Sequence, residues 1–169
     1  MEHYPIAELL GVTVNSIRKD DHVFVLETSD GASFRAHSVI YCAGKEYRRL
    51  GVPGESRFIG KGIAFCATCD APLFRDKTVA VVGGGNSAFS SARDLIPFAR
   101  EIHVINILND FQADPVLISE VKNARHVRLH PGMQVIEFLG AERLQGIRVE
   151  AIDGSSRFDL PVDGVFLEI

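Results

Sequence analysis

Apolar and polar residues alternate along the start of the chain, a pattern that is typical of half-buried β-strands. Before these strands, residues 5–10 predict the last turn of a helix, with Gly11 placed to cap it. Residues 29–31 contain Asp and Gly, which tolerate the positive φ of a tight hairpin turn. The pattern predicts strands over residues 12–17, 23–27, 33–36 and 38–42.

The apolar period is lost over residues 45–62, where Gly and Arg are frequent. Such a segment predicts a linker between two lobes. We therefore expect a β-rich segment over residues 1–52 and a second domain over residues 53–169. The arginines of the linker are expected to be solvated, namely Arg48, Arg49 and Arg57.

The second half of the chain alternates strand and helix patterns. A continuous apolar run over residues 78–82 predicts a buried strand, and the helix after it begins near Asn86 and ends before Pro97. Another helix begins at Pro115, with Asp114 as its N-cap. Further strands are predicted over residues 102–108, 127–129, 135–139, 146–152, 157–160 and 165–169. This order predicts an α/β fold, a Rossmann-like parallel sheet with helices on one face and an antiparallel three-stranded meander on the other.

A glycine-rich turn directly follows the strand over residues 78–82 and matches G-x-G-x-x-A. Its first glycine would form the tight turn, its third would let a dinucleotide diphosphate approach the backbone, and its alanine would pack the helix against the strand. The polar pair after the glycines would add N–H and hydroxyl donors at the positive end of the helix. An ordinary tight turn is the alternative. The candidate cofactor-binding residues are Gly83, Gly84, Gly85, Asn86, Ser87 and Ala88.

The strand over residues 102–108 ends where a dinucleotide fold reads the adenosine ribose. A carboxylate there binds the 2′-hydroxyl of NAD, and an arginine pairs with the 2′-phosphate of NADP. Residues 103–121 contain neither Arg nor Lys, whereas Asn106 can bind a ribose hydroxyl and Asp110 can replace the carboxylate. NADH is therefore preferred over NADPH.

Cys66 and Cys69 form a C-x-x-C pair that Asp70 follows directly. A dithiol makes and breaks disulfides, but thiolates at this spacing also bind zinc. Zinc would need two more ligands, and because Cys42 is the only other cysteine, scattered histidines would have to supply them. Only thirteen residues separate the dithiol from Gly83, so the pair predicts electron transfer between a nucleotide and thiols.

Charge and hydropathy disfavour several classes of partner. The net charge is −4, from 22 acidic and 18 basic residues without a basic run, so neither nucleic acid nor an anionic membrane is expected. No apolar stretch approaches the roughly 20 residues that span a bilayer, and the N-terminus lacks the basic region of a signal peptide. A cytoplasmic setting is expected, in which a C-x-x-C is catalytic or metal-binding rather than a structural disulfide.

Four segments resemble signatures of the low-molecular-weight thioredoxin reductases and, more closely, of the flavoprotein component of alkyl hydroperoxide reductase. They are LGVPGE (50–55), FCATCDAPLF (65–74), VAVVGGGNSA (79–88) and DGVF (163–166). The resemblance implies an FAD domain that is interrupted by an NAD(P)H domain carrying the dithiol. Residues 1–52 would then be part of the FAD domain, with Gly44 near the flavin. The family's N-terminal FAD glycine motif and its C-terminal flavin-closing segment are absent, so this chain alone is expected to bind flavin poorly and to be inactive.

The resemblance also implies roles for the dithiol residues. Cys69 would face the flavin, Cys66 would attack the partner disulfide, and Asp70 would donate and accept the proton. A cap of the next turn is the alternative for Asp70. NADPH-dependent thioredoxin reductases carry a His-Arg-Arg run and a later Arg, and the matching positions here are Asn106, Ile107, Leu108 and Gln112.

The full-length protein is thus expected to be an NAD(P)H-dependent protein-disulfide reductase. Electrons would pass through FAD to the dithiol and on to a thioredoxin-like or peroxiredoxin-linked partner, and the full-length enzyme is expected to be a homodimer. Since nicotinamide and dithiol would share one domain, a rotation about residues 52–62 would present each to the flavin in turn. The alternatives are a nucleotide-binding module without turnover and a structural zinc domain.

Overall fold

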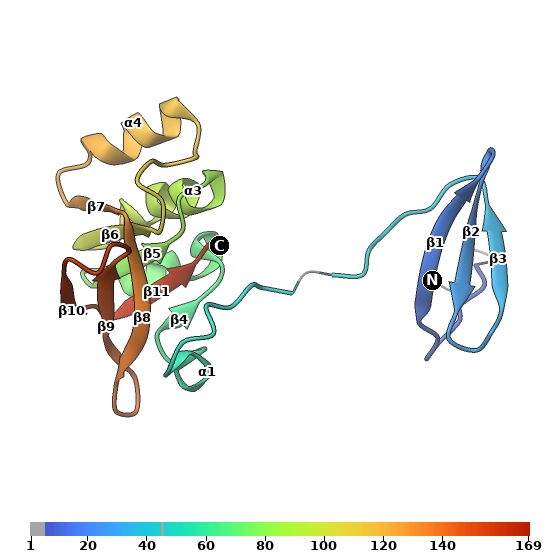
Figure 1. Ribbon diagram of the computed structural model, residues 1–169, viewed down its shortest axis with the longest axis horizontal. Helices are drawn as coiled ribbons and strands as arrows, with labels where there is room; N and C mark the ends of the chain where they lie inside the picture. Colours follow the sequence, from blue (N-terminus) through green and yellow to red (C-terminus); the bar gives the residue numbers. More distant parts are fainter. Residues whose placement is uncertain (1–5, 45) are drawn as a thin grey trace. The chain divides into compact units, whose positions relative to one another are not determined.

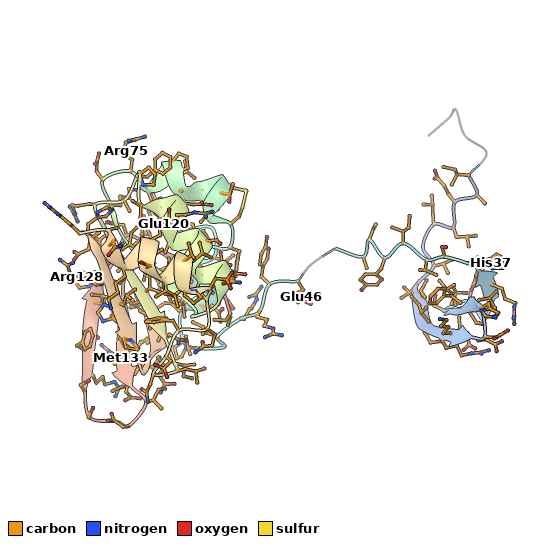
Figure 2. The ribbon with its side chains drawn as sticks, turned by 90° about the horizontal axis from the view of Figure 1, so that it is seen from above. His37, Glu46, Arg75, Glu120, Arg128 and Met133 are labelled. Atoms are coloured by element: carbon orange, nitrogen blue, oxygen red, sulfur yellow. A yellow bond between two sulfur atoms is a disulfide. The ribbon has the colours of Figure 1, made fainter. Side chains whose placement is uncertain are left out.

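The computed structural model describes residues 6–44 and 46–169, and the chain divides into two compact units, Met1–Lys45 and Glu46–Ile169. Glu46, labelled in Figure 2, is the first residue of the second unit. The sequence pattern instead places the division after residue 52. The difference arises because Leu50 and Val52 pack against a core cluster of the second unit.

The first unit is a three-stranded antiparallel sheet in the order β1-β2-β3 (Figure 1). The hairpin turn lies where the sequence predicts it, because Asp30 Oδ1 accepts hydrogen bonds from Thr28 Oγ1 at 2.6 Å and from Ala32 N at 3.2 Å. The Thr28 hydroxyl and the Ala32 N–H lower the pKa of the Asp30 carboxyl. The strands are β1 (Val14–Asp20), β2 (Val23–Thr28) and β3 (Ser33–Ala36).

Two predicted elements of the first unit are wrong. Residues 38–42 form no strand, and the side chains of Ile40 and Tyr41 are 89% and 77% exposed, so their apolar character does not mark burial here. Residues 6–10 form no helix, and residue 5 lies outside the described residues. Gly11 does adopt a positive φ of 73°, but in a turn.

The second unit is built on a five-stranded parallel sheet in the order β4-β11-β5-β6-β7. The central strand β5 is buried along its whole length, as a parallel sheet covered on both faces requires. The strands are β4 (Ile63–Ala64), β5 (Thr78–Val82), β6 (Glu101–Asn106), β7 (Val127–Pro131) and β11 (Gly164–Leu167).

Side chains alternate between the two faces of this sheet and so belong to two core clusters. Val79 and Val81 of β5 pack in one cluster with Phe89 of helix α3 (Asn86–Leu95). Ala80 and Val82 pack in the other with Ile147 of the meander. Helix α4 (Pro115–Asn123) lies on the side of α3, and strands β8 (Met133–Gly140), β9 (Leu144–Ala151) and β10 (Arg157–Pro161) lie on the other side (Figure 1). The predicted α/β fold class is therefore confirmed.

The segment expected to be a linker is largely part of the second unit. Helix α1 (Glu55–Phe58) begins within it, and Phe58 is only 1% exposed. The buried Glu55 carboxylate accepts the backbone N–H groups of Leu50 at 3.0 Å and Gly51 at 2.7 Å. The buried carboxylate thus holds most of the predicted linker to the second unit, which begins at Glu46. No helix among the described residues is long and apolar enough to cross a membrane.

Candidate functional site

Cys66 and Cys69 are joined in a disulfide with their Cα atoms 5.4 Å apart. Cys66 precedes the short helix α2 (Ala67–Asp70), and its carbonyl accepts the Asp70 N–H at 3.0 Å. Ala67 is buried and anchors the turn, whereas Cys66 is half-buried and Cys69 is exposed. The disulfide therefore lies at the surface of the second unit, where a reacting group can reach it.

Asp70 lies between α2 and the 3-10 helix η1 (Ala71–Phe74). It occupies the N-cap position of η1, but its side chain makes no capping hydrogen bond there. The structure thus does not bear out the alternative role of Asp70 as a cap. Asp70 is half-buried and directly follows Cys69 in the chain.

Helix α2 is hydrogen-bonded to helix α3, the helix that follows the glycine-rich turn. Thr68, between the two cysteines, donates a hydrogen bond from Oγ1 to Asp94 Oδ2 at 2.9 Å. Asp94 lies in the last turn of α3, so the helix that carries Cys69 contacts the helix that follows the glycine turn. Helix α3 therefore carries the glycine turn at its beginning and the contact with the disulfide-bearing helix at its end.

The glycine-rich turn lies at the carboxyl end of β5 and leads into α3, as a dinucleotide site requires. A Cβ on Gly83, whose φ is 144°, would collide with the backbone oxygen of Glu168, and one on Gly84 would collide with the Asn106 side chain. A Cβ on Gly85 would meet nothing within 4 Å. The turn therefore keeps an open position at Gly85.

The polar residues after the glycines differ in their surroundings. Asn86 donates from Nδ2 to Asp114 Oδ2 at 3.2 Å and accepts the Asp114 backbone N–H at 2.7 Å, so its side chain connects the beginnings of α3 and α4. Ser87 is exposed, and Ala88 is fully buried between helix and sheet. Asn86 and Ser87 are both exposed, but the Asn86 amide is engaged with Asp114, whereas the Ser87 side chain makes no hydrogen bond within the described part of the chain.

Asn106, at the end of β6, is buried and engaged within its own loop. Its Nδ2 donates to the carbonyls of Asp110 at 2.7 Å and Leu108 at 3.2 Å. Gln112 N in turn donates to Gly84 O at 2.8 Å, which ties the loop to the glycine turn. Ile107 and Leu108 are 56% and 53% exposed, so apolar side chains occupy the place where a 2′-phosphate clamp would lie.

A cavity of about 680 Å³ connects the glycine turn with the end of β6. Met133, labelled in Figure 2, contributes from the first position of β8. Arg48 also lines the cavity, and the sequence did not assign it to this site because it precedes the glycines by more than thirty residues. The other predicted cofactor residue, Gly44, lies in the first unit with a φ of 82° and open space around it.

A structural zinc site has no support among the described residues. Cys66 and Cys69 are oxidised to a disulfide, and the remaining cysteine, Cys42, is exposed in the first unit. No group of three or more His, Cys, Asp or Glu side chains in the described part of the chain is arranged to hold a metal ion.

Comparison with known proteins matches residues 2–169 to a family model described as pyridine nucleotide-disulphide oxidoreductase. The chain belongs to this family. Among curated members, it is 32% identical to a component of alkyl hydroperoxide reductase from Staphylococcus aureus, covering all of this chain and 33% of that protein. It is 36% identical over 158 residues to thioredoxin reductase from Mycoplasma genitalium, covering 92% of this chain and 50% of that enzyme.

Solved structures of family members show the same fold. The thioredoxin reductase of T. acidophilum matches 94% of this chain and 52% of its own, with a TM-score of 0.76 at 31% identity. A ferredoxin-flavin thioredoxin reductase from Clostridium acetobutylicum matches 92% of this chain and 49% of its own, with a TM-score of 0.56 at 29% identity. The resemblance that the four motifs predict is confirmed, and the chain spans about a third to a half of these oxidoreductases.

Proposed function

We propose that this chain is the pyridine-nucleotide and dithiol part of a flavin-dependent disulfide reductase of the thioredoxin reductase type. The observation that carries the proposal is the Thr68–Asp94 hydrogen bond, which joins the disulfide-bearing helix to the helix that follows the glycine turn. A redox-active disulfide and a diphosphate site on one compact unit are what such an enzyme needs.

In the proposed reaction, FAD held by the rest of the protein would supply the disulfide with two electrons taken from the nucleotide. With two protons, these electrons convert the Cys66–Cys69 disulfide into two thiols, and the Asp70 carboxyl holds and returns a proton. The Cys66 thiolate then attacks the partner disulfide, which forms a mixed disulfide and releases one partner thiol. The Cys69 thiolate attacks Cys66 in turn, which releases the reduced partner and restores the original disulfide.

The preferred nucleotide in this proposal is NADH rather than NADPH. A 2′-phosphate needs a cationic partner, and the β6 end offers the exposed apolar side chains Ile107 and Leu108 instead. The Asn106 side-chain amide donates its N–H groups to the loop carbonyls of Leu108 and Asp110. Its Oδ1 atom is therefore the group that would accept a hydrogen bond from a ribose hydroxyl. The protein surface at the end of β6 would therefore bind adenosine through its shape and through apolar contacts rather than through charge.

The proposed partner is a thioredoxin-like or peroxiredoxin-linked disulfide protein, in the cytoplasm and with a homodimeric full-length enzyme. Nicotinamide and dithiol share one unit, so each can meet the flavin only after a rotation. Residues 50–58 are held to the second unit by Glu55 and Phe58, so we place the joint at the division between the two units rather than over residues 52–62.

Trapping a mixed disulfide tests the exchange step. In a Cys42→Ser background, the reduced chain is mixed with oxidised thioredoxin, and adducts are separated on non-reducing gels and weighed by mass spectrometry. Cys69→Ser should accumulate an adduct through Cys66, because the resolving thiolate is missing. Cys66→Ser should accumulate far less, and the chain with both cysteines should oxidise without an adduct. No adduct with Cys69→Ser, together with no oxidation of the intact dithiol, would refute the proposal.

A nucleotide-binding module without turnover is the second candidate, since the chain spans only part of its relatives. The two candidates differ in whether the chain exchanges thiols with a partner disulfide. The purified chain is expected to be colourless and to show no NADH-dependent disulfide reductase activity by itself. A preparation that stays colourless, binds NADH and exchanges no thiols with a partner disulfide would favour the second candidate.

A further inference from the structure

The cavity beside the glycine turn contains a positive charge that the nucleotide motif does not provide. Of the side chains that line it, Arg48 is the only basic one. Gly85 and Leu108 line the same cavity, so Arg48 shares one space with both the open position of the turn and the end of β6. The arginine comes from the segment before α1, outside the strand–turn–helix unit.

The Arg48 guanidinium is available for a ligand. The residue is exposed, and among the described residues it makes neither a hydrogen bond nor an ion pair. Its neighbour Arg49 donates from Nη1 to Ser56 Oγ at 3.5 Å and does not line the cavity. Two adjacent arginines therefore have different surroundings, and only one of them faces the candidate nucleotide site.

The backbone around Arg48 is anchored to the second unit on both sides. On one side, the Tyr47 ring stacks on Phe65 with centroids 4.6 Å apart and an interplanar angle of 23°. On the other, the Leu50 and Gly51 N–H groups bind the buried Glu55 carboxylate. Arg48 is thus held at the cavity by contacts within the same unit.

We propose that Arg48 pairs with the diphosphate of the bound dinucleotide. The inference rests on the proposed function and adds a specificity residue to it. A diphosphate carries two negative charges, and the first turn of α3 offers only about half a positive charge. Residues 103–121 supply no cation, whereas the planar guanidinium can donate two parallel hydrogen bonds to phosphate oxygens.

Titration of the full chain with NADH, NADPH, ADP-ribose and adenosine tests this pairing. Fluorescence or calorimetry would compare the wild-type chain with Arg48→Gln and with the matched control Arg49→Gln. A charge-assisted contact predicts that Arg48→Gln weakens the three diphosphate ligands by about tenfold each and leaves adenosine unchanged. Arg49→Gln should change every dissociation constant by less than about twofold.

The outcomes separate this inference from the function on which it rests. If the wild-type chain binds none of the three diphosphate ligands, the proposed nucleotide site fails and the pairing fails with it. If the wild-type chain binds them and Arg48→Gln binds them equally well, the pairing alone is refuted. A loss confined to NADPH would assign Arg48 to the 2′-phosphate and overturn the diphosphate assignment.

Discussion

The three adjacent glycines Gly83, Gly84 and Gly85 are chemically identical, but each has a different environment in the fold. Gly83 combines a positive φ with close approach to the Glu168 backbone, and Gly84 packs on the Asn106 side chain. Gly85 faces open space with an ordinary φ of −92°. The first two are therefore required by the fold, and only the third is left free for a ligand.

A pair of alanine substitutions separates folding from binding at this turn. Gly84→Ala should lower the free energy of unfolding by about 1–3 kcal/mol, because Asn106 is held by its own hydrogen bonds and cannot move aside. Gly85→Ala should stay within about 1 kcal/mol of the wild-type stability but raise the dissociation constant of NADH at least about tenfold. Urea denaturation and NADH titration measure the two effects. Equal loss of stability in both variants would contradict the assignment.

At the scale of elements, β6 and β7 bring two histidines together beneath the meander. His103 Nδ1 lies 3.0 Å from His130 Nε2, and Glu101 Oε2 lies 3.8 Å from His103 Nε2. Burial lowers the pKa of both imidazoles, and the charge of His130 lowers the pKa of His103 further against the opposing effect of Glu101. The environment between β6 and β7 therefore favours the neutral form of both histidines.

The stability of the second unit should depend on pH through this pair. Because the folded-state pKa values lie below the ordinary value of about 6.5, the unfolded chain binds protons first as pH falls. Stability should be constant above pH ~7 and should decrease, by on the order of 1 kcal/mol, as pH falls from about 6.5 toward the lowered pKa values. Urea midpoints over this range would show it. His103→Gln should flatten the decrease, His22→Gln should not, and stability that rises on acidification would exclude this account.

At the scale of the whole molecule, each sheet is formed by strands of a single unit. Strands β1, β2 and β3 pair only with one another, and both core clusters of the second unit lie within Glu46–Ile169. The second unit also contains the disulfide, the glycine turn and the cavity. Its binding properties are thus expected to belong to it alone.

Two truncations test where the second unit begins. A chain that starts at Glu46 should bind NADH within about twofold of the full chain, since the cavity and its anchors are kept. A chain that starts at Pro53 should be less stable by about 2–4 kcal/mol, because Glu55 stays buried without the Leu50 and Gly51 donors. Urea denaturation compares the two. Equal stability would move the boundary back to the position that the sequence pattern indicates.

Sequence periodicity predicted most of the second unit and less of the first. The helix beginning at Asn86 and the strand over residues 78–82 were placed correctly, because a buried apolar run and a glycine turn are local signals. The strand over residues 38–42 was wrong, since apolar content alone does not tell a buried strand from an exposed segment. The buried role of Glu55 also escaped prediction, because its partners are known only from the folded backbone.

The sequence by itself determined the fold class, the family and the two devices, a C-x-x-C pair and a glycine turn. These follow from the spacing of neighbouring residues, which sets backbone torsions and side-chain periodicity locally. Only the tertiary structure decided that Thr68 binds Asp94, that Asn106 supports Gly84, and that Arg48 shares the cavity. Such contacts join segments far apart in the chain, and the packing of the whole unit, which no local pattern encodes, brings them within reach.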